Sequence, residues 1–304
     1  MTDAGAPAQK EAATLGTKIY LSTTGAPVDP SEAKISVFDR GFLYGDSVYE
    51  TMRTAGGRPI ELGRHIARLH RSADGIGLAI PFADDMLGDA IAQTHAASGN
   101  DESYVRVIIT RGEGPLMLDP RKSEAPTLVI IVQPLQVPTE DAYRRGIAAV
   151  IVGTTKTQGA VDPAIKSGNY LGSILALRQA IAEGGDDAIL CTATGEIAEG
   201  ATSNVFFVVG GGLRTPDLQF GLLAGITREL VCELATELGL AVTHDRVSPD
   251  DLRAADEVFL TSSVRGIMPV TSIDGRRIGD GTEGAVTQRV RARYDAYLDA
   301  CTRA

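Results

Sequence analysis

Three polar residues stand in segments where their side chains could carry chemistry. Lys166 precedes a predicted helix in the small-residue segment AIKSGNYLGS, so its amine could act as a desolvated nucleophile. Glu199 lies in a predicted glycine-bounded turn before a buried strand, where a carboxylate is costly without a cation or a hydrogen-bond donor. Thr227 stands where GLLAGITREL turns into a helix, and helix N-termini bind phosphate groups. The plainer interpretations are a solvated lysine and a threonine that only caps the helix.

The sequence lacks the motifs of several large enzyme classes. It contains no GxxxxGK[ST] loop, no GxSxG elbow and no HExxH, which excludes the P-loop, α/β-hydrolase and zincin classes. We expect surface or packing roles for the four scattered histidines, which are His65, His70, His95 and His244. The three cysteines follow no metal-ligand or redox spacing; they are Cys191, Cys232 and Cys301. This pattern predicts no metal site, no disulfide scaffold and a reducing, cytoplasmic location.

Composition and charge exclude two kinds of partner. Asp and Glu number 39 against 29 Lys and Arg, which gives a net charge of −10 and argues against nucleic-acid binding. The longest apolar runs, such as 128–132 and 205–209, are far shorter than the roughly 20 residues that span a membrane. The first residues also lack the apolar core of a signal peptide. We therefore expect neither nucleic acid nor membrane as a partner.

Runs rich in Val and Ile alternate with helical patterns and predict an α/β fold in two domains. We expect a flexible tail (1–16), a small α+β domain (17–133), a linker (134–141) and a larger α/β domain (142–304). Strands are predicted at 18–22, 47–54, 103–111 and 125–133 in the first domain, and at 148–153, 187–191, 204–209, 241–247 and 256–262 in the second. Helices are predicted at 61–78, 83–97, 227–238 and 283–298, and after Gly168.

Seven segments that occur in order between residues 18 and 298 resemble one enzyme family. They are DRGFLYGDSVYET, HIARL, YVR, KSGNYL, EGATSN, GITR and LTSSVR. Together they resemble the class IV, or fold-type IV, aminotransferases, a group that includes branched-chain and D-amino acid aminotransferases and aminodeoxychorismate lyase. The resemblance implies fold type IV and the cofactor pyridoxal 5′-phosphate (PLP).

The resemblance also implies a role for each residue that matches a cofactor-binding motif. Lys166 would form the Schiff base with the cofactor aldehyde, and Glu199 would keep the pyridine nitrogen protonated. Tyr170 would bind the phenolic oxygen, and Leu223 would pack on the ring. The phosphate would be bound by a guanidinium, backbone N–H groups and hydroxyls, supplied by Arg68, Ile226, Thr227 and Ser263.

The substrate side implied by the resemblance comprises Tyr44, Tyr49, Tyr104, Arg106, Val264 and Arg265. Tyr104 and Arg106 resemble a branched-chain pocket, whereas the short spacing from Lys166 to Tyr170 resembles the D-amino acid branch. Arg265 stands in a turn where branched-chain enzymes carry small, uncharged residues. If both arginines reach the substrate, they would hold a dicarboxylic acceptor such as 2-oxoglutarate. These features slightly favour D-amino acid donors over branched-chain L-amino acid donors.

The predicted activity is a ping-pong transfer of an amino group from an amino acid to a 2-oxo acid such as 2-oxoglutarate or pyruvate. The predicted assembly is a homodimer with composite active sites, in which the partner's loops around Tyr44 complete each pocket. Three alternatives stay open: a branched-chain L-amino acid aminotransferase, an aminodeoxychorismate lyase, and a cofactor-free, non-catalytic oligomer. GEGPLMLDPRK (112–122) favours a transaminase over the lyase, and Lys166 with Glu199 counts against the non-catalytic oligomer.

Overall fold

The computed structural model describes residues 15–123, 125–153 and 162–303, which form two compact units. Unit 1 contains the chain up to Gln136, the segment Lys166–Gly168 and the C-terminal residues from Cys301. Unit 2 contains Val137–Ile165 and Asn169–Ala300. The expected tail at 1–16 lies almost entirely outside the described residues. Among the described residues, no helix is long and apolar enough to cross a membrane.

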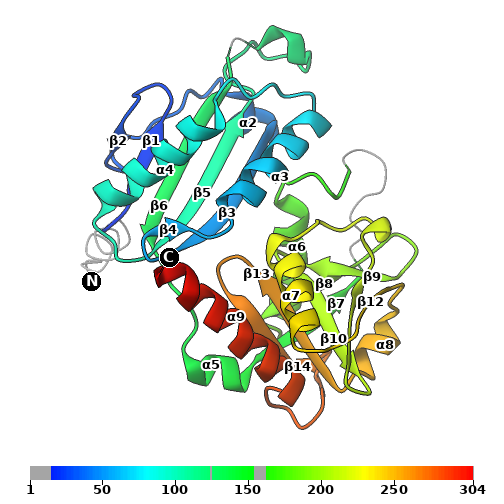
Figure 1. The fold of residues 1–304 in the computed structure, drawn as a ribbon. Helices are drawn as coiled ribbons and strands as arrows, with labels where there is room; N and C mark the ends of the chain where they lie inside the picture. The colour runs from blue at the N-terminus through cyan, green and yellow to red at the C-terminus, as the bar shows by residue number, and fades with distance from the viewer. Residues whose placement is uncertain (1–14, 124, 154–161, 304) are drawn as a thin grey trace, which may run out of the picture. The chain divides into compact units, whose positions relative to one another are not determined.

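Unit 1 is built on an antiparallel sheet in the order β2-β1-β6-β5-β3-β4. The strands are β1 (Lys18–Leu21), β2 (Pro27–Val28), β3 (Ser47–Ala55), β4 (Arg58–Pro59), β5 (Ser103–Thr110) and β6 (Thr127–Pro134). The helices are α2 (Arg40–Tyr44), α3 (Leu62–Gly75), α4 (Asp84–Ser98) and the short 3₁₀ helix η1 (Pro120–Lys122). Helix α3 packs against β3, and α4 packs against β6 and β1 (Figure 1).

The two faces of this sheet differ in burial because side chains alternate along each strand. In β5, Val105 and Val107 are buried, whereas Tyr104 and Arg106 between them are half-buried. The buried face also carries Glu50 of β3, which contacts α3. The opposite face carries Tyr49, Tyr104 and Arg106, three of the residues that the sequence assigned to the substrate.

Unit 2 contains a mixed sheet in the order β12-β11-β10-β13-β14-β7-β8-β9, with β15 beside β14. Its strands are β7 (Ile147–Val152), β8 (Asp187–Cys191), β9 (Ile197–Gly200), β10 (Asn204–Val209), β11 (Gly212–Pro216), β12 (Val242–Asp245), β13 (Glu257–Ser262), β14 (Gly266–Ile273) and β15 (Arg276–Arg277). Its helical segments are α5 (Glu140–Arg145), α6 (Leu171–Ala182), η2 (Leu218–Phe220), α7 (Ile226–Glu237), α8 (Pro249–Arg253) and α9 (Ala285–Arg303), of which α9 continues into unit 1 beyond Ala300.

The structure differs from the sequence-based expectation at two places that matter for the site. Glu199 does not lie in a turn; it lies inside β9, which pairs with β8 through Leu190. Lys166 belongs by its contacts to unit 1, although its position in the chain suggested the second domain. Both differences arise from backbone pairing with another segment, β8 for Glu199 and β3 for the segment of Lys166, which the pattern within one segment does not encode.

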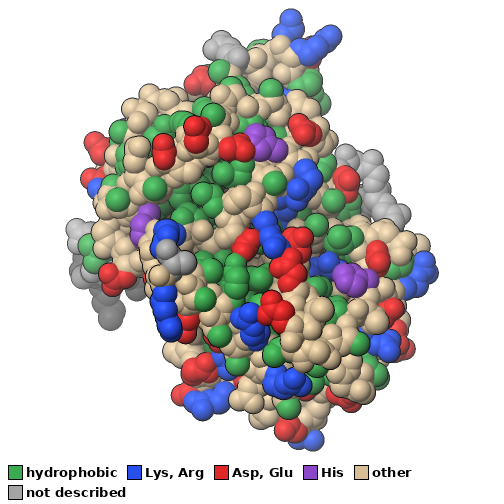
Figure 2. Space-filling model, in the orientation of Figure 1, with side chains coloured by type: hydrophobic (Ala, Val, Ile, Leu, Met, Phe, Trp, Pro, Cys, Tyr) green, Lys and Arg blue, Asp and Glu red, His purple; other side chains and the backbone are tan. Residues whose placement is uncertain are grey.

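Charged side chains are mixed by sign on the surface. On the face drawn in Figure 2, the described lysine and arginine side chains are interspersed with aspartate and glutamate. This distribution does not form the concentrated basic stripe that a phosphate backbone would need.

Candidate active site

Lys166 is fixed beside β3 by backbone hydrogen bonds. Its carbonyl accepts from the Tyr49 N–H (3.0 Å), and its own N–H donates to Ser72 Oγ of α3 (3.1 Å). Two residues later, the Gly168 N–H donates to the Ser47 carbonyl (2.9 Å). A Cβ at Gly168 would lie 2.2 Å from Ser47 Oγ, so a larger residue would force the Ser47 side chain or this segment to move. The sheet edge therefore positions the lysine.

The side chain of Tyr49 lies between two cations of unit 1. The Lys166 amine donates to the Tyr49 hydroxyl (3.1 Å), and its nitrogen lies 4.4 Å from the ring centroid. The Arg106 guanidinium carbon lies 4.4 Å from the same centroid. Cations bind the electron-rich face of an aromatic ring. Tyr49 therefore connects the candidate nucleophile with an arginine that the sequence assigned to the substrate.

A buried acid, Glu50, organises two residues of α3. Arg68 donates from Nε to Glu50 Oε1 and from Nη2 to Oε2, both at 2.7 Å. His65 Nδ1 lies 2.7 Å from Oε2, and it carries the proton because the carboxylate only accepts. Burial raises the pKa of Glu50, but the hydrogen bonds from Arg68 and His65 outweigh burial and lower it to about 2. Burial lowers the pKa of His65, which favours the neutral ring, whereas the contact with Glu50 acts in the opposite direction.

The role of Glu50 was not predicted from the sequence, and Arg68 was assigned only to the phosphate. The structure shows a bidentate pair that fixes the direction of the guanidinium before any ligand binds. A signal existed, because His65 and Arg68 are three residues apart and therefore share one helix face. Two donors on an inward face call for a buried acceptor.

Glu50 makes the stability of the fold depend on pH. Its pKa is lowered from 4.5 to about 2, so its stabilising contribution is present above pH 4.5 and is lost as the pH falls towards 2. A shift of this size corresponds to about 3 kcal/mol of unfolding free energy. We expect the unfolding free energy of Glu50→Gln, measured with urea, to fall less between pH 5 and pH 3 than that of wild type. The exposed control Glu32→Gln should show the same fall as wild type. Equal losses in all three proteins would contradict this role.

In unit 2, Glu199 is held against the loop that precedes α7. The side chain is buried, and Oε2 accepts from the Leu223 N–H (3.0 Å). The Leu223 carbonyl in turn accepts from Asn204 Nδ2 (2.9 Å). Both backbone polar groups of Leu223 are therefore hydrogen-bonded, and the contact with Glu199 fixes the carboxylate against the loop.

Helix α7 begins with buried residues and a glycine cap. Gly225 is the N-cap residue, so the interpretation of Thr227 as the cap is wrong; Ile226 and Thr227 are the first helical residues. A Cβ at Gly225 would lie 1.9 Å from Asn204 Oδ1, which explains the glycine. Among the described residues, no side chain caps this helix. Its first backbone N–H groups thus suit an anion.

Two buried hydroxyl groups of unit 2 add to this set of donors. Thr261 Oγ1 and Ser203 Oγ have no hydrogen-bond partner within the part of the chain that the structure describes. Thr261 is the register partner of Asn204, which contacts the start of α7 and follows Ser203 in the chain. A buried unpaired hydroxyl costs about 1–3 kcal/mol, which a bound phosphate or water would recover. N–H groups with hydroxyls are the donor set that a phosphate ester requires.

The remaining unit 2 residues assigned by sequence lie at turns and helix ends. Ser263, Val264 and Arg265 form the half-buried turn between β13 and β14, and Tyr170 is the N-cap residue of α6. The Arg265 guanidinium donates from Nη2 to Asp187 Oδ2 (2.7 Å), a contact the sequence did not indicate. This arginine is already neutralised by an acid of its own unit.

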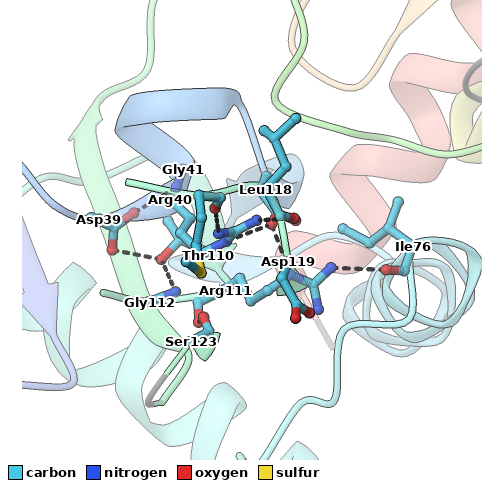
Figure 3. Close-up of polar contacts among 12 residues, drawn as sticks. Asp39, Arg40, Gly41, Ile76, Thr110, Arg111, Gly112, Leu118, Asp119 and Ser123 are labelled. Atoms are coloured by element: carbon cyan, nitrogen blue, oxygen red, sulfur yellow. Dashed lines mark hydrogen bonds and ion pairs between the residues drawn. The ribbon is translucent and has the colours of Figure 1, made fainter. Parts of the chain in front are cut away.

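Tyr44 ends helix α2, next to an arginine that ties two loops together. Arg40 is buried, stacks on the Tyr44 ring (5.1 Å), and donates to the carbonyls of Met117 (2.7 Å) and Leu118 (3.2 Å). Asp46 accepts from the Nε atoms of Arg40 (3.0 Å) and Arg111 (2.8 Å). Figure 3 shows Arg40 directed towards the Leu118 carbonyl and Arg111 directed towards the Ile76 carbonyl, which accepts from Arg111 Nη2 (2.8 Å). The loop at 112–118 is thus held against α2.

These two loops expose a group of large apolar side chains. The most exposed are Val37, Phe42, Leu116 and Leu118, at 64–76% of their maximum. Hydrogen bonds between the loops hold this group together, for example from the Gly114 N–H to the Phe38 carbonyl (3.3 Å). Large exposed apolar side chains on neighbouring segments are typical of an interaction site.

Comparisons with known proteins agree on one family. Residues 47–273 match the family described as amino-transferase class IV. A putative branched-chain-amino-acid aminotransferase of Methanocaldococcus jannaschii is 39% identical over 279 residues, covering 91% of this chain and 95% of that protein. D-alanine aminotransferase of Bacillus licheniformis is 32% identical over 267 residues, covering 88% and 93%. The crystal structure of a branched-chain aminotransferase from the archaeon Thermoproteus uzoniensis with norvaline has a TM-score of 0.86 at 32% identity, covering 93% of this chain and 95% of that chain.

Proposed function

Because the chain belongs to the class IV aminotransferases, PLP-dependent enzymes of fold type IV, we propose that it moves the amino group of a branched-chain L-amino acid to a 2-oxo acid. One observation carries the choice of donor: the Arg265 guanidinium is bound to Asp187 at 2.7 Å. The expected preference for D-amino acids depended on Arg265 acting with Arg106 on the substrate. An Arg265 that is bound to an acid of its own unit weakens that expectation.

The surroundings of Arg106 support an apolar donor. Its register partner on β6 is Ile131, and the next pair on the same sheet face is Ile108 with Val129. All three are half-buried. Arg106 beside these apolar side chains suits a substrate with a carboxylate and an aliphatic side chain. The name of the Methanocaldococcus jannaschii relative supports the same choice.

D-amino acid donors are the second candidate. The short spacing between Lys166 and Tyr170 favours them, as does the similarity to a D-alanine aminotransferase. The aminodeoxychorismate lyase and the non-catalytic oligomer are not supported, because the relatives reported above are aminotransferases.

The residues present fit PLP. In unit 2, the start of α7 and the nearby buried hydroxyls offer phosphate donors, so we assign the phosphate to Ile226, Thr227 and Ser263, together with Arg68 of unit 1. Leu223 would pack on the ring, and Tyr170 would bind the phenolic oxygen. When bound, PLP supplies a carbonyl that combines with amines and a ring that withdraws electrons.

The chain's own residues then have separate tasks. Glu199 keeps a proton on the pyridine nitrogen, while its contact with the Leu223 N–H fixes the direction of the carboxylate. The Lys166 amine moves the proton at the substrate Cα, and the Tyr49 hydroxyl orients that amine. Arg106 binds the substrate carboxylate beside Tyr49.

We expect Arg68→Ala to retain PLP less well than wild type, because a directed guanidinium contact to the phosphate is lost. The matched control is Arg71→Ala, which removes an exposed arginine from the same helix. The measurement is the rate at which PLP absorbance is lost during dialysis in phosphate-free buffer. Equal loss rates for the two variants would contradict the assignment and leave Arg68 as the partner of Glu50 only.

The exposed loops at 34–44 and 112–118 support a homodimer with composite active sites. Both segments carry exposed apolar side chains, and Arg40 joins them, because it stacks on the Tyr44 ring and donates to the Met117 carbonyl. A second copy of the chain would cover this apolar surface.

The three cysteines are unpaired in the structure, which supports a reducing, cytoplasmic location.

A donor comparison tests the proposed function. The holoenzyme is assayed with L-leucine, D-alanine and D-glutamate, each paired with 2-oxoglutarate or pyruvate, in wild type, Arg106→Ala and Arg265→Ala. We expect turnover of L-leucine that falls sharply in Arg106→Ala and changes little in Arg265→Ala. Turnover of D-amino acids that depends on Arg265 would overturn the proposal and favour the second candidate.

A further inference from the structure

The turn between β13 and β14 is held at one residue from two directions. Ser262 pairs with Gly266, so residues 263–265 form the loop, and Gly266 has the positive φ (63°) that closes such a loop. The Arg265 carbonyl accepts from the Tyr143 hydroxyl of α5 (2.7 Å), and its guanidinium donates to an acid of β8 (2.7 Å). The backbone and the side chain of Arg265 are thus bound to different elements of unit 2. Tyr143 was not among the residues that the sequence assigned to the site.

The Tyr143 ring is itself held by a buried arginine of α9. The Arg291 guanidinium carbon lies 4.9 Å from the ring centroid. Arg291 donates from Nε to Glu283 Oε1 and from Nη1 to Glu140 Oε1, both at 2.6 Å. Glu140 and Tyr143 are three residues apart on α5 and therefore share one helix face. A guanidinium that is bound by two carboxylates has a fixed direction, so the ring beneath it and the ring's hydroxyl are held in one place.

The loop that Tyr143 holds carries Ser263, which we assign to the PLP phosphate. Ser263 stands two residues before Arg265, whose carbonyl accepts the hydrogen bond. A hydroxyl binds an oxygen acceptor well only within about 2.5–3.0 Å. The backbone has only two soft dihedral angles per residue, so a movement of the Arg265 carbonyl is passed to Ser263 across a short link. The Tyr143 hydroxyl therefore acts on the phosphate contact through the loop.

A second hydroxyl joins the same helix to the same strand and provides an internal comparison. Thr271 of β14 donates from Oγ1 to the Arg145 carbonyl of α5 (2.9 Å). This contact lies along the strand, away from the turn. If the Tyr143 hydroxyl only stabilised the packing of α5 on β14, the two hydroxyls would be equivalent. A hydroxyl that positions the turn has an effect on ligands that Thr271 lacks.

We propose that Tyr143 is a positioning residue that holds the β13–β14 turn where Ser263 binds the PLP phosphate. This inference rests on the proposed aminotransferase function, which supplies the phosphate. Because the acceptor is a backbone carbonyl, the contact persists in Arg265→Ala. The inference therefore agrees with the small change in turnover expected for that variant.

Tyr143→Phe tests the proposal, because it removes the hydroxyl and keeps the ring under Arg291. The measurement is the rate at which PLP leaves the holoenzyme in phosphate-free buffer. We expect this rate to rise about 2- to 10-fold, the effect of one neutral hydrogen bond, and the ³¹P resonance of the bound cofactor to shift. The matched control is Thr271→Val, which should lower the melting temperature by a similar small amount and leave both readouts at wild-type values. Equal changes in the two variants, or no change in Tyr143→Phe, would overturn the proposal.

A binding comparison separates this inference from the proposed function. Full-length wild type and Tyr143→Phe are titrated with PLP and with pyridoxal, which has the same ring and aldehyde but no phosphate. We expect Tyr143→Phe to bind PLP more weakly and pyridoxal equally well, whether or not any donor is turned over. Equal weakening for both compounds would overturn the inference. A wild type that binds PLP no more tightly than pyridoxal would contradict the phosphate assignment of the proposed function, and the inference with it.

Discussion

We expect Lys166→Ala to lose amino transfer by at least about 10²- to 10⁴-fold, the usual contribution of a positioned acid–base group. The variant lacks both the amine that bonds to the cofactor and the base that moves the substrate proton. Its fold should persist, because the hydrogen bonds that hold this segment on Tyr49 and Ser72 use backbone atoms of residue 166. The measurement is turnover of the best donor by purified, PLP-saturated protein.

The matched control for this variant is Lys122→Ala, which removes an exposed lysine at the end of η1. The control should keep wild-type turnover, and both variants should show wild-type circular dichroism. A Lys166→Ala protein that is folded and retains a tenth of the wild-type rate would refute the assigned role.

The second large effect is expected for Glu199→Gln. The amide oxygen can still accept from the Leu223 N–H, so the loop before α7 should stay in place. The neutral side chain no longer favours a proton on the pyridine nitrogen, so charge that develops in the transition state is stabilised less. A charge-assisted hydrogen bond is worth roughly 1.5–3 kcal/mol, which corresponds to a 10- to 150-fold lower kcat.

Cofactor affinity and kcat are the two measurements for Glu199→Gln. PLP affinity should change little, whereas kcat should fall. The control is Glu183→Gln, an exposed carboxylate at the end of α6. If Glu199→Gln keeps kcat within about twofold of wild type, Glu199 is a buried structural acid and not a cofactor ligand.

Local sequence patterns predicted much of this fold. Alternation of apolar and polar residues placed β5 and β6 within two residues of their ends, and helical periodicity placed α3 and α4. The α/β class and the family also followed from the ordered motifs. In each case the signal lies within one segment, because burial of one face imposes a repeat on neighbouring residues.

Contacts between distant segments were not predictable in this way. Glu50 meets Arg68 across 18 residues, and Arg265 meets Asp187 across 78. No periodicity encodes such a pair, because the partner is chosen by how the elements pack. Glu199 was expected in a turn because β9 is only four residues long and its pairing with β8 decides its conformation.

The central claim is that this chain acts as an aminotransferase through PLP carried on Lys166. The most direct measurement is borohydride reduction of the wild-type holoenzyme, followed by proteolysis and mass spectrometry of the peptides. We predict a single pyridoxyl label, on the peptide that contains Lys166. A label on any other lysine, with the Lys166 peptide unmodified, would contradict the account.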